Sequence, residues 1–220
     1  VRLRLVLQDL GPSFVKLGQM ASTRRDLLPE EIIVELEKLQ DSVPPCTFQQ
    51  VREQVEGSLG QQISAVFESF DPEPLAAASI AQVHLAQLRT EDGVEQVVVK
   101  VQRPDVARTI ASDLDLLHAL AALIERTIPE TKVYSPSGLV RQLDRAIVDE
   151  LDFVVEAENA ERFAQNFEGS PDVAIPRVFR EASAKRVLTL ERFEGPKLRD
   201  ALEQGHSGPR LARIALDTLF

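Results

Sequence analysis

The stretch Val97-Val98-Val99-Lys100-Val101 holds four β-branched residues around a single lysine. Such a composition favours a β-strand. A second β-rich run lies upstream at residues 80–88, and the turn Thr90-Glu91-Asp92-Gly93 lies between the two runs. Two β-rich runs on either side of a glycine-bearing turn predict an antiparallel hairpin. We take this hairpin as the centre of the fold.

Two long helical patterns follow the hairpin. Residues 105–128 carry apolar side chains at i, i+3 and i+4 spacing, which predicts an amphipathic helix. Its apolar face consists of Leu114, Leu117, Leu120 (or Ala121) and Ile124. Ser135-Pro136 is an N-cap residue followed by proline in the first turn, and it opens a predicted helix over residues 135–167.

The remaining segments complete a mixed pattern. Residues 1–67 read as helices, and Thr47 with Gln50 forms a capping-box pattern at the start of one of them. Two short strands are expected at residues 177–179 and 186–190, before a last group of helices. This order predicts an α+β fold in which helices pack on a small antiparallel sheet.

Composition narrows the possible functions. The chain has 220 residues and a formal net charge of −10, which argues against a general nucleic-acid partner because phosphate neutralisation needs a basic surface. The single cysteine, Cys46, cannot form an intrachain disulfide, which indicates a reducing compartment. The longest apolar stretch, residues 116–124, is much shorter than the about 20 residues needed to cross a bilayer. We therefore expect a cytoplasmic segment without a membrane span.

Lys100 is the first candidate for chemistry. A lysine among strand valines is either a solvated edge residue or a cation held in a cleft by an anion, because an unpaired buried ammonium is costly. The expected anion is Glu150, which falls on the apolar stripe of the predicted 135–167 helix. A strand lysine paired with a helix glutamate positions nucleotide phosphates in kinases. The alternative for Glu150 is a boundary position whose head group reaches water.

Other candidates are weaker when taken singly. Asp152, Glu156 and Asn159 form a second stripe, which would lie about 200° from Glu150 on a continuous helix. This stripe is either a solvated acidic face of the helix or a surface that faces a cation from another part of the chain. Lys16 and Gln19 share a helix face, and Gly18 between them permits close packing.

The segment before the first strand is rich in alanine. It occupies the place of the phosphate-covering loop of kinases, which usually contains glycines. Alanine is the next smallest residue, so the segment either covers phosphates or is a plain turn between strands. Its residues are Ala76, Ala77, Ala78 and Ser79.

Taken together and in order, these motifs resemble the UbiB/AarF family of atypical, protein-kinase-like proteins. The resemblance runs from about Leu10 to Gly195. It rests on Lys16-Leu17-Gly18-Gln19, residues 76–83, Val98-Val99-Lys100-Val101-Gln102-Arg103-Pro104, and Glu150-Leu151-Asp152-Phe153 with Glu156 and Asn159. It implies a helical extension over residues 1–67, a kinase-like N-terminal lobe over 68–194, and the start of a truncated C-terminal lobe over 195–220.

The resemblance also implies roles for single residues. Lys100 matches the nucleotide-binding lysine, Glu150 its helix partner, and Asp152 completes a Glu-x-Asp motif. Residues Ala76, Ala77, Ala78, Ser79 and Val83 match the loop and strand over the nucleotide, and Glu191 to Phe193 match the hinge that holds adenine. Lys16 and Gln19 match a Lys-x-Gly-Gln signature whose helix folds over the active site. We therefore expect Lys16 to approach Asp152 or Glu156.

The family supports biosynthesis of ubiquinone and related isoprenoid quinones, and its members bind ATP or ADP with Mg²⁺. The resemblance thus implies an atypical kinase or ATPase. Both ends of the chain look cut, and the catalytic loop and Asp-Phe-Gly motif are not in it, so we expect the Mg²⁺ ligands and any membrane attachment outside this segment. The alternative is a non-catalytic pseudokinase scaffold that binds partners, such as quinone-biosynthesis proteins, through its helical extension.

Overall fold

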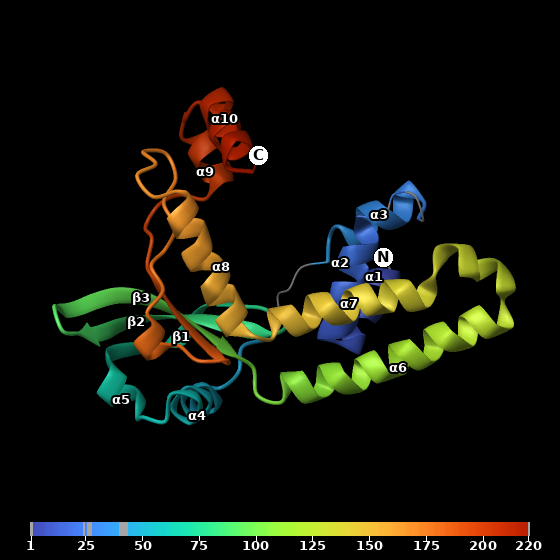
Figure 1. Ribbon diagram of the computed structural model, residues 1–220, viewed down its shortest axis with the longest axis horizontal. Helices are drawn as coiled ribbons and strands as arrows, with labels where there is room; N and C mark the ends of the chain where they lie inside the picture. The colour runs from blue at the N-terminus through green and yellow to red at the C-terminus, as the bar shows by residue number, and fades with distance from the viewer. Residues whose placement is uncertain (1, 24, 26–27, 40–43, 220) are drawn as a thin grey trace.

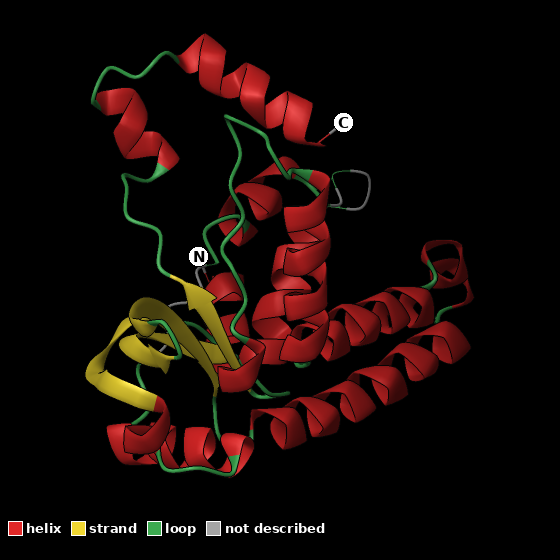
Figure 2. Ribbon diagram, turned by 60° about the vertical axis from the view of Figure 1, so that its left-hand side comes forward, coloured by secondary structure: helices red, strands yellow, loops and turns green. Residues whose placement is uncertain are grey.

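A four-stranded antiparallel sheet forms one end of the molecule. The computed structural model describes residues 2–23, 25, 28–39 and 44–219. The sheet has the order β1-β2-β3-β4, and Figure 2 shows it packed between helices. Its strands are β1 (Phe67–Ala77), β2 (Ala81–Thr90), β3 (Gly93–Gln102) and β4 (Val187–Glu191). The α+β class predicted from the sequence is confirmed.

The predicted hairpin is β2 and β3. These strands pair without a register shift from Ala81 opposite Gln102 to Thr90 opposite Gly93. Gly93 has φ 131°, a backbone conformation that residues with a Cβ rarely adopt, so a glycine at this turn position relieves strain. The local sequence therefore determines the central pair of strands.

β1 runs through Asp71-Pro72-Glu73-Pro74, a stretch with two prolines, which usually interrupt a strand. The strand survives because it is an edge strand, where a residue without an N–H group need not donate to a neighbour. Its pairing with β2 shifts register between Phe70 and Pro74 and again between Pro74 and Ala76. These irregularities absorb the prolines.

Two helices extend from the sheet as an antiparallel hairpin (Figure 1). They are α6 (Val106–Thr127) and α7 (Pro136–Glu150), joined by the 3-10 helix η1 (Pro129–Tyr134). Their facing sides bury Ile110, Leu114, Leu117, Ala121, Val140, Leu143 and Ile147. Ala121, the alternative in the predicted apolar face, points into this core, whereas Leu120 is exposed.

The expectation of a single helix over residues 135–167 is wrong. The chain breaks after α7 and continues as α8 (Phe153–Asn166). Asp152 has extended backbone angles, φ −110° and ψ 97°, and its side chain accepts a hydrogen bond from the Val154 N–H. The freed backbone groups find partners elsewhere, because Gln102 Nε2 donates to the Leu151 carbonyl at 2.8 Å and the Phe153 N–H donates to the Lys185 carbonyl at 3.1 Å.

The N-terminal helices divide between two places. Helices α1 (Arg2–Leu10), α2 (Pro12–Ser22) and α3 (Glu30–Leu36) pack together, and α2 also lies against the α6–α7 hairpin. Helix α4 (Phe48–Leu59), which begins at the predicted Thr47–Gln50 capping box, buries Val51 and Val55 against the sheet together with short α5 (Ile63–Val66). It covers the face opposite α8.

The last segments lead away from the sheet. The 3-10 helix η2 (Arg180–Ala182) precedes β4, and helices α9 (Leu198–Glu203) and α10 (Gly208–Leu219) follow it. Figure 1 shows α9 and α10 beyond the far end of α8.

Candidate functional site

The sheet register brings several predicted site residues into one row. Ala76 lies opposite Val83, Val83 opposite Lys100, and Lys100 opposite Leu188. Directly opposed residues on antiparallel strands project to the same face. Leu188 packs with Phe153 of α8, so this row lies on the face that α8 covers.

Lys100 forms an ion pair with Glu156 of α8. Its Nζ atom lies 2.6 Å from Glu156 Oε2 and 4.7 Å from the centre of the Phe153 ring, where the ring face adds a cation–π contact. The two side chains of the pair are 28% and 40% exposed, so both can still reach a ligand. The predicted Lys100–Glu150 pair is wrong, because the break after α7 places Glu156, not Glu150, opposite the strand.

Glu150 instead pairs with the extension. Lys16 Nζ of α2 lies 2.6 Å from Glu150 Oε2, the last residue of α7. This carboxylate oxygen is buried, and the Lys16 ammonium compensates its charge. The expectation that Lys16 approaches Asp152 or Glu156 is therefore wrong. Even so, α2 does reach the junction from which α8 begins.

Asp152 caps α8. One carboxylate oxygen accepts the Val154 N–H at 3.0 Å, and the other lies 3.4 Å from Lys185 Nζ. A carboxylate at a helix N-terminus stabilises the first turn and its dipole. Sequence reasoning missed Lys185, which follows α8 in the chain and returns to the junction before β4.

The signature around Lys16 also packs the extension. Gly18 is buried, and a Cβ atom built on it would lie 2.3 Å from Leu39 Cδ1 and 2.9 Å from Leu7 Cδ1. The close packing predicted for this glycine is thus confirmed. Gln19 points toward the same region, with Nε2 3.5 Å from the Leu39 carbonyl.

The alanine-rich segment forms the turn between β1 and β2. Ala76 and Ala77 end β1, and the Ala78 N–H donates to the Ala81 carbonyl at 2.8 Å. Arg103 holds this turn, because its Nε donates to the Ala78 carbonyl at 2.7 Å and its backbone N–H donates to the Ile80 carbonyl. Sequence reasoning missed this role, although Arg103 directly follows the strand that carries Lys100.

Glu191 and Phe193 lie at the end of β4. The Glu191 N–H donates to the Arg177 carbonyl at 2.9 Å, and its carboxylate accepts the Arg177 N–H. Phe193 is half-exposed. The role of this segment in holding adenine stays a prediction.

A buried polar chain crosses the opposite face of the sheet. The Cys46 N–H donates to Gln82 Oε1 at 2.7 Å, Gln82 Nε2 lies 2.9 Å from His84 Nε2, and His84 Nδ1 lies 2.8 Å from the Asp71 carbonyl. Since a carbonyl only accepts, His84 Nδ1 must donate and Nε2 must accept from Gln82. Burial lowers the pKa of His84, although its hydrogen bond to the Asp71 backbone and the charges of Asp71 and Glu73 oppose the shift.

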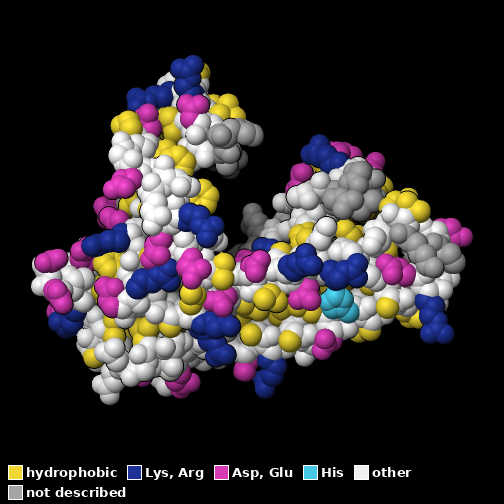
Figure 3. All heavy atoms as spheres, viewed as in Figure 1, with side chains coloured by type: hydrophobic (Ala, Val, Ile, Leu, Met, Phe, Trp, Pro, Cys, Tyr) yellow, Lys and Arg dark blue, Asp and Glu magenta, His cyan; other side chains and the backbone are white. Residues whose placement is uncertain are grey.

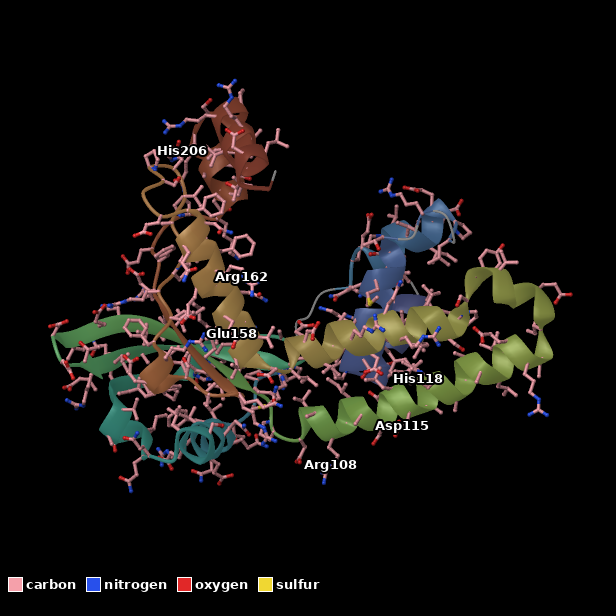
Figure 4. All side chains as sticks on the ribbon, in the orientation of Figure 1. Arg108, Asp115, His118, Glu158, Arg162 and His206 are labelled. Atoms are coloured by element: carbon pink, nitrogen blue, oxygen red, sulfur yellow. The ribbon has the colours of Figure 1, made fainter. Side chains whose placement is uncertain are left out.

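Charged side chains of both signs are spread over the face of the molecule that Figure 3 shows. Glu158 and Arg162 of α8 are exposed (Figure 4). Among the described residues, no three or more His, Cys, Asp or Glu side chains come together as a metal site. No helix in the described ranges is long and apolar enough to cross a membrane.

The family model of the ABC1 atypical kinase-like domain matches residues 38–218. The chain belongs to this family. "Probable protein kinase UbiB" of Pseudomonas fluorescens (strain SBW25) is 49% identical over 199 residues, which is 90% of this chain and 37% of that protein. The protein of the same name from Azotobacter vinelandii (strain DJ / ATCC BAA-1303) is 45% identical, and the match covers 100% of this chain and 41% of that protein.

A solved structure has a similar fold to this chain. The Rv3197–erythromycin complex from Mycobacterium tuberculosis superposes with a TM-score of 0.63 at 30% identity, over 93% of this chain and 51% of that one. The chain thus represents part of an atypical kinase-like protein of the UbiB family, and spans about two-fifths of the length of the curated relatives named above.

Proposed function

We propose that this chain is the nucleotide-binding portion of a UbiB-family atypical kinase or ATPase. The observation that carries the proposal is the 2.6 Å pair between Lys100 on β3 and Glu156 on α8. In protein kinases a strand lysine held by a helix glutamate contacts the nucleotide phosphates. A role of the whole protein in isoprenoid quinone biosynthesis is proposed from the UbiB name of the relatives alone.

In this proposal each element around Lys100 has a task. Glu156 and the Phe153 ring hold the ammonium in place, so that little side-chain entropy is lost when a phosphate binds. The turn at residues 76–79 covers the phosphates, Val83 lines the site beside Lys100, and residues 191–193 hold adenine.

The extension has a separate role. Lys16 and Glu150 join α2 to the end of α7, two residues before the cap residue Asp152. We assign Lys16, Gln19 and Asp152 to holding the extension and α8 in a fixed relation, which controls access to the site. Magnesium would neutralise phosphate charge when bound with the nucleotide, but the described residues do not assemble a site for it.

Ligand-induced stabilisation of the full-length protein tests the proposal. With Mg-ATP or Mg-ADP at 100 times its dissociation constant, unfolding should cost about 2.7 kcal/mol more than without nucleotide. Lys100→Ala should abolish this gain because the phosphates lose their cation. Lys38→Ala, which removes an exposed lysine of a surface pair, should keep the gain.

Two results would contradict the assignment. A full gain in the Lys100→Ala protein would show that Lys100 is structural, and no gain in the unmutated protein would remove nucleotide binding altogether. Nucleotide binding without turnover would instead favour the pseudokinase scaffold.

A further inference from the structure

Helix α6 is apolar on two sides. Its inner side packs on α7 through Leu114, Leu117 and Ala121. Its outer side carries Leu116, Leu120 and Leu123, which are 61%, 48% and 55% exposed. We call these three residues the α6 leucine stripe. A row of exposed leucines on one side of a helix, rimmed by polar residues, is typical of a surface that a partner covers. Figure 3 shows apolar atoms along this arm of the molecule.

The stripe has the spacing of a coiled-coil seam. Its leucines follow each other at i, i+4 and i+7 and lie within an arc of about 60°. Exposed Asp115 and Arg126 lie near its two ends. They are separated by eleven residues, which is three helical turns, so they lie within about 20° of each other on one flank of the stripe.

The exposed side of α6 is partly symmetric about the point between Ala119 and Leu120, where Leu120 of one copy would lie level with Ala119 of the other. Leu116 mirrors Leu123, and further out Ser112 mirrors Thr127. Two such helices that pack antiparallel about a twofold axis therefore present the same side chains to each other. In that arrangement the flank that carries Asp115 and Arg126 meets the same flank of the second copy. Asp115 therefore faces Arg126 of the second copy, and the two residues are offset by about 3 Å along the helix axis. In a parallel pair opposite flanks would meet, and these charges would not.

We propose that α6 binds α6 of a second copy of this chain in an antiparallel, twofold-symmetric dimer. The leucine stripe forms the seam, and the Asp115–Arg126 contact, made twice, sets the direction and register. A membrane surface fits less well, because helices that lie on membranes carry many Lys and Arg residues on the polar face, whereas one acid and one base flank this stripe. In Figure 4 Asp115 lies on α6 on the side away from α7.

A charge swap tests the proposal with the full-length protein, by light scattering after gel filtration and by analytical ultracentrifugation. Asp115→Arg and Arg126→Asp each place like charges opposite each other twice, so each should raise the dimer dissociation constant about tenfold or more. An equimolar mixture of the two variants should dimerise again, because both contacts between the unlike chains then join opposite charges. The double variant D115R/R126D should also dimerise.

Leu120→Glu supplies a second measurement, since a carboxylate in the seam should leave only monomer. Leu75→Glu is the matched control, because Leu75 is also an exposed leucine, at 62%, but lies on β1. A wild-type monomer at all concentrations would overturn the proposal, as would a dimer that the single swaps leave intact or that mixing does not restore. Monomeric protein whose binding to phosphatidylglycerol vesicles depends on Leu120 would assign the stripe to a membrane instead.

Discussion

Gly18 decides how closely α2 can approach its neighbours. A Cβ atom there would lie 2.3 Å from Leu39 Cδ1, so Gly18→Ala should lower the free energy of unfolding by about 1–3 kcal/mol, as overpacking does. This loss should outweigh the gain of up to about 1 kcal/mol from better helix propensity. Gly57→Ala in α4 is the control, because nothing lies within 4 Å of its Cβ position, and it should stabilise. Urea unfolding measures both, and a G18A protein as stable as the wild type would contradict the steric reading.

Single residues were predicted from the sequence where their role is local. The need for a small residue at Gly18 and the Thr47–Gln50 capping box follow from neighbours in the chain. The ion-pair partners of Lys100 and Lys16 were not predicted. Both acids lie within one short stretch, and the choice between Glu150 and Glu156 depends on a helix break whose stabilising contacts come from β3 and from Lys185.

Gln102 holds the break between α7 and α8. Its amide donates to the Leu151 carbonyl from the strand that carries Lys100, and the side chain is buried. Gln102→Leu leaves that carbonyl without its donor, so unfolding should become easier by about 1–3 kcal/mol. The nucleotide-induced stabilisation should also shrink, because Glu156 is no longer held opposite Lys100. Thermal melts of the full-length protein with and without Mg-ADP measure both effects.

The matched control is Gln96→Leu, an exposed position on the same strand whose amide oxygen accepts from Arg192. It should leave the nucleotide response unchanged. An undiminished response in the Gln102→Leu protein would show that the break is held by Asp152 and Lys185 without the strand.

Elements with a strong local signal were predicted well, and those that depend on tertiary context were not. The β2–β3 hairpin and α6 follow from β-branched runs and helical periodicity. β1 was not expected, because its two prolines are tolerated only at a sheet edge, and a sequence pattern does not show which strand is the edge. The break between α7 and α8 was not predicted for a similar reason, because the helical spacing of apolar residues continues across it.

Stability of the whole molecule should fall in mild acid through His84. Burial lowers the pKa of His84 in the folded protein, whereas in the unfolded chain it takes its ordinary value of about 6.5. The contribution of neutral His84 to the free energy of unfolding is therefore fully present above about pH 6.5. It is lost as the pH falls toward the folded-state pKa, by up to about 1.4 kcal/mol per pH unit. Protonation would also break the acceptor role of Nε2 toward Gln82.

Urea unfolding of the wild-type protein and a His84→Gln variant from about pH 8 to pH 5 measures this dependence. The free energy of unfolding of the variant should fall less in acid, because the titration of His84 no longer contributes. His206→Gln, at an exposed histidine before α10, is the control. Parallel pH profiles for wild type and His84→Gln would exclude His84 as the source.

The α6–α7 hairpin leaves the sheet and returns to it at nearly the same point. Gln102, the last residue of β3, touches the carbonyl of Leu151, the residue directly after α7. The chain between them is thus a closed excursion, and lengthening such a loop costs little additional closure entropy. During evolution the α6–α7 hairpin could therefore change in length by insertions and deletions without moving Lys100 relative to Glu156. Replacing it by a short linker would leave the strand–helix pair in place, but it would release the extension that Lys16 anchors and uncover Ile80 beside the alanine-rich turn.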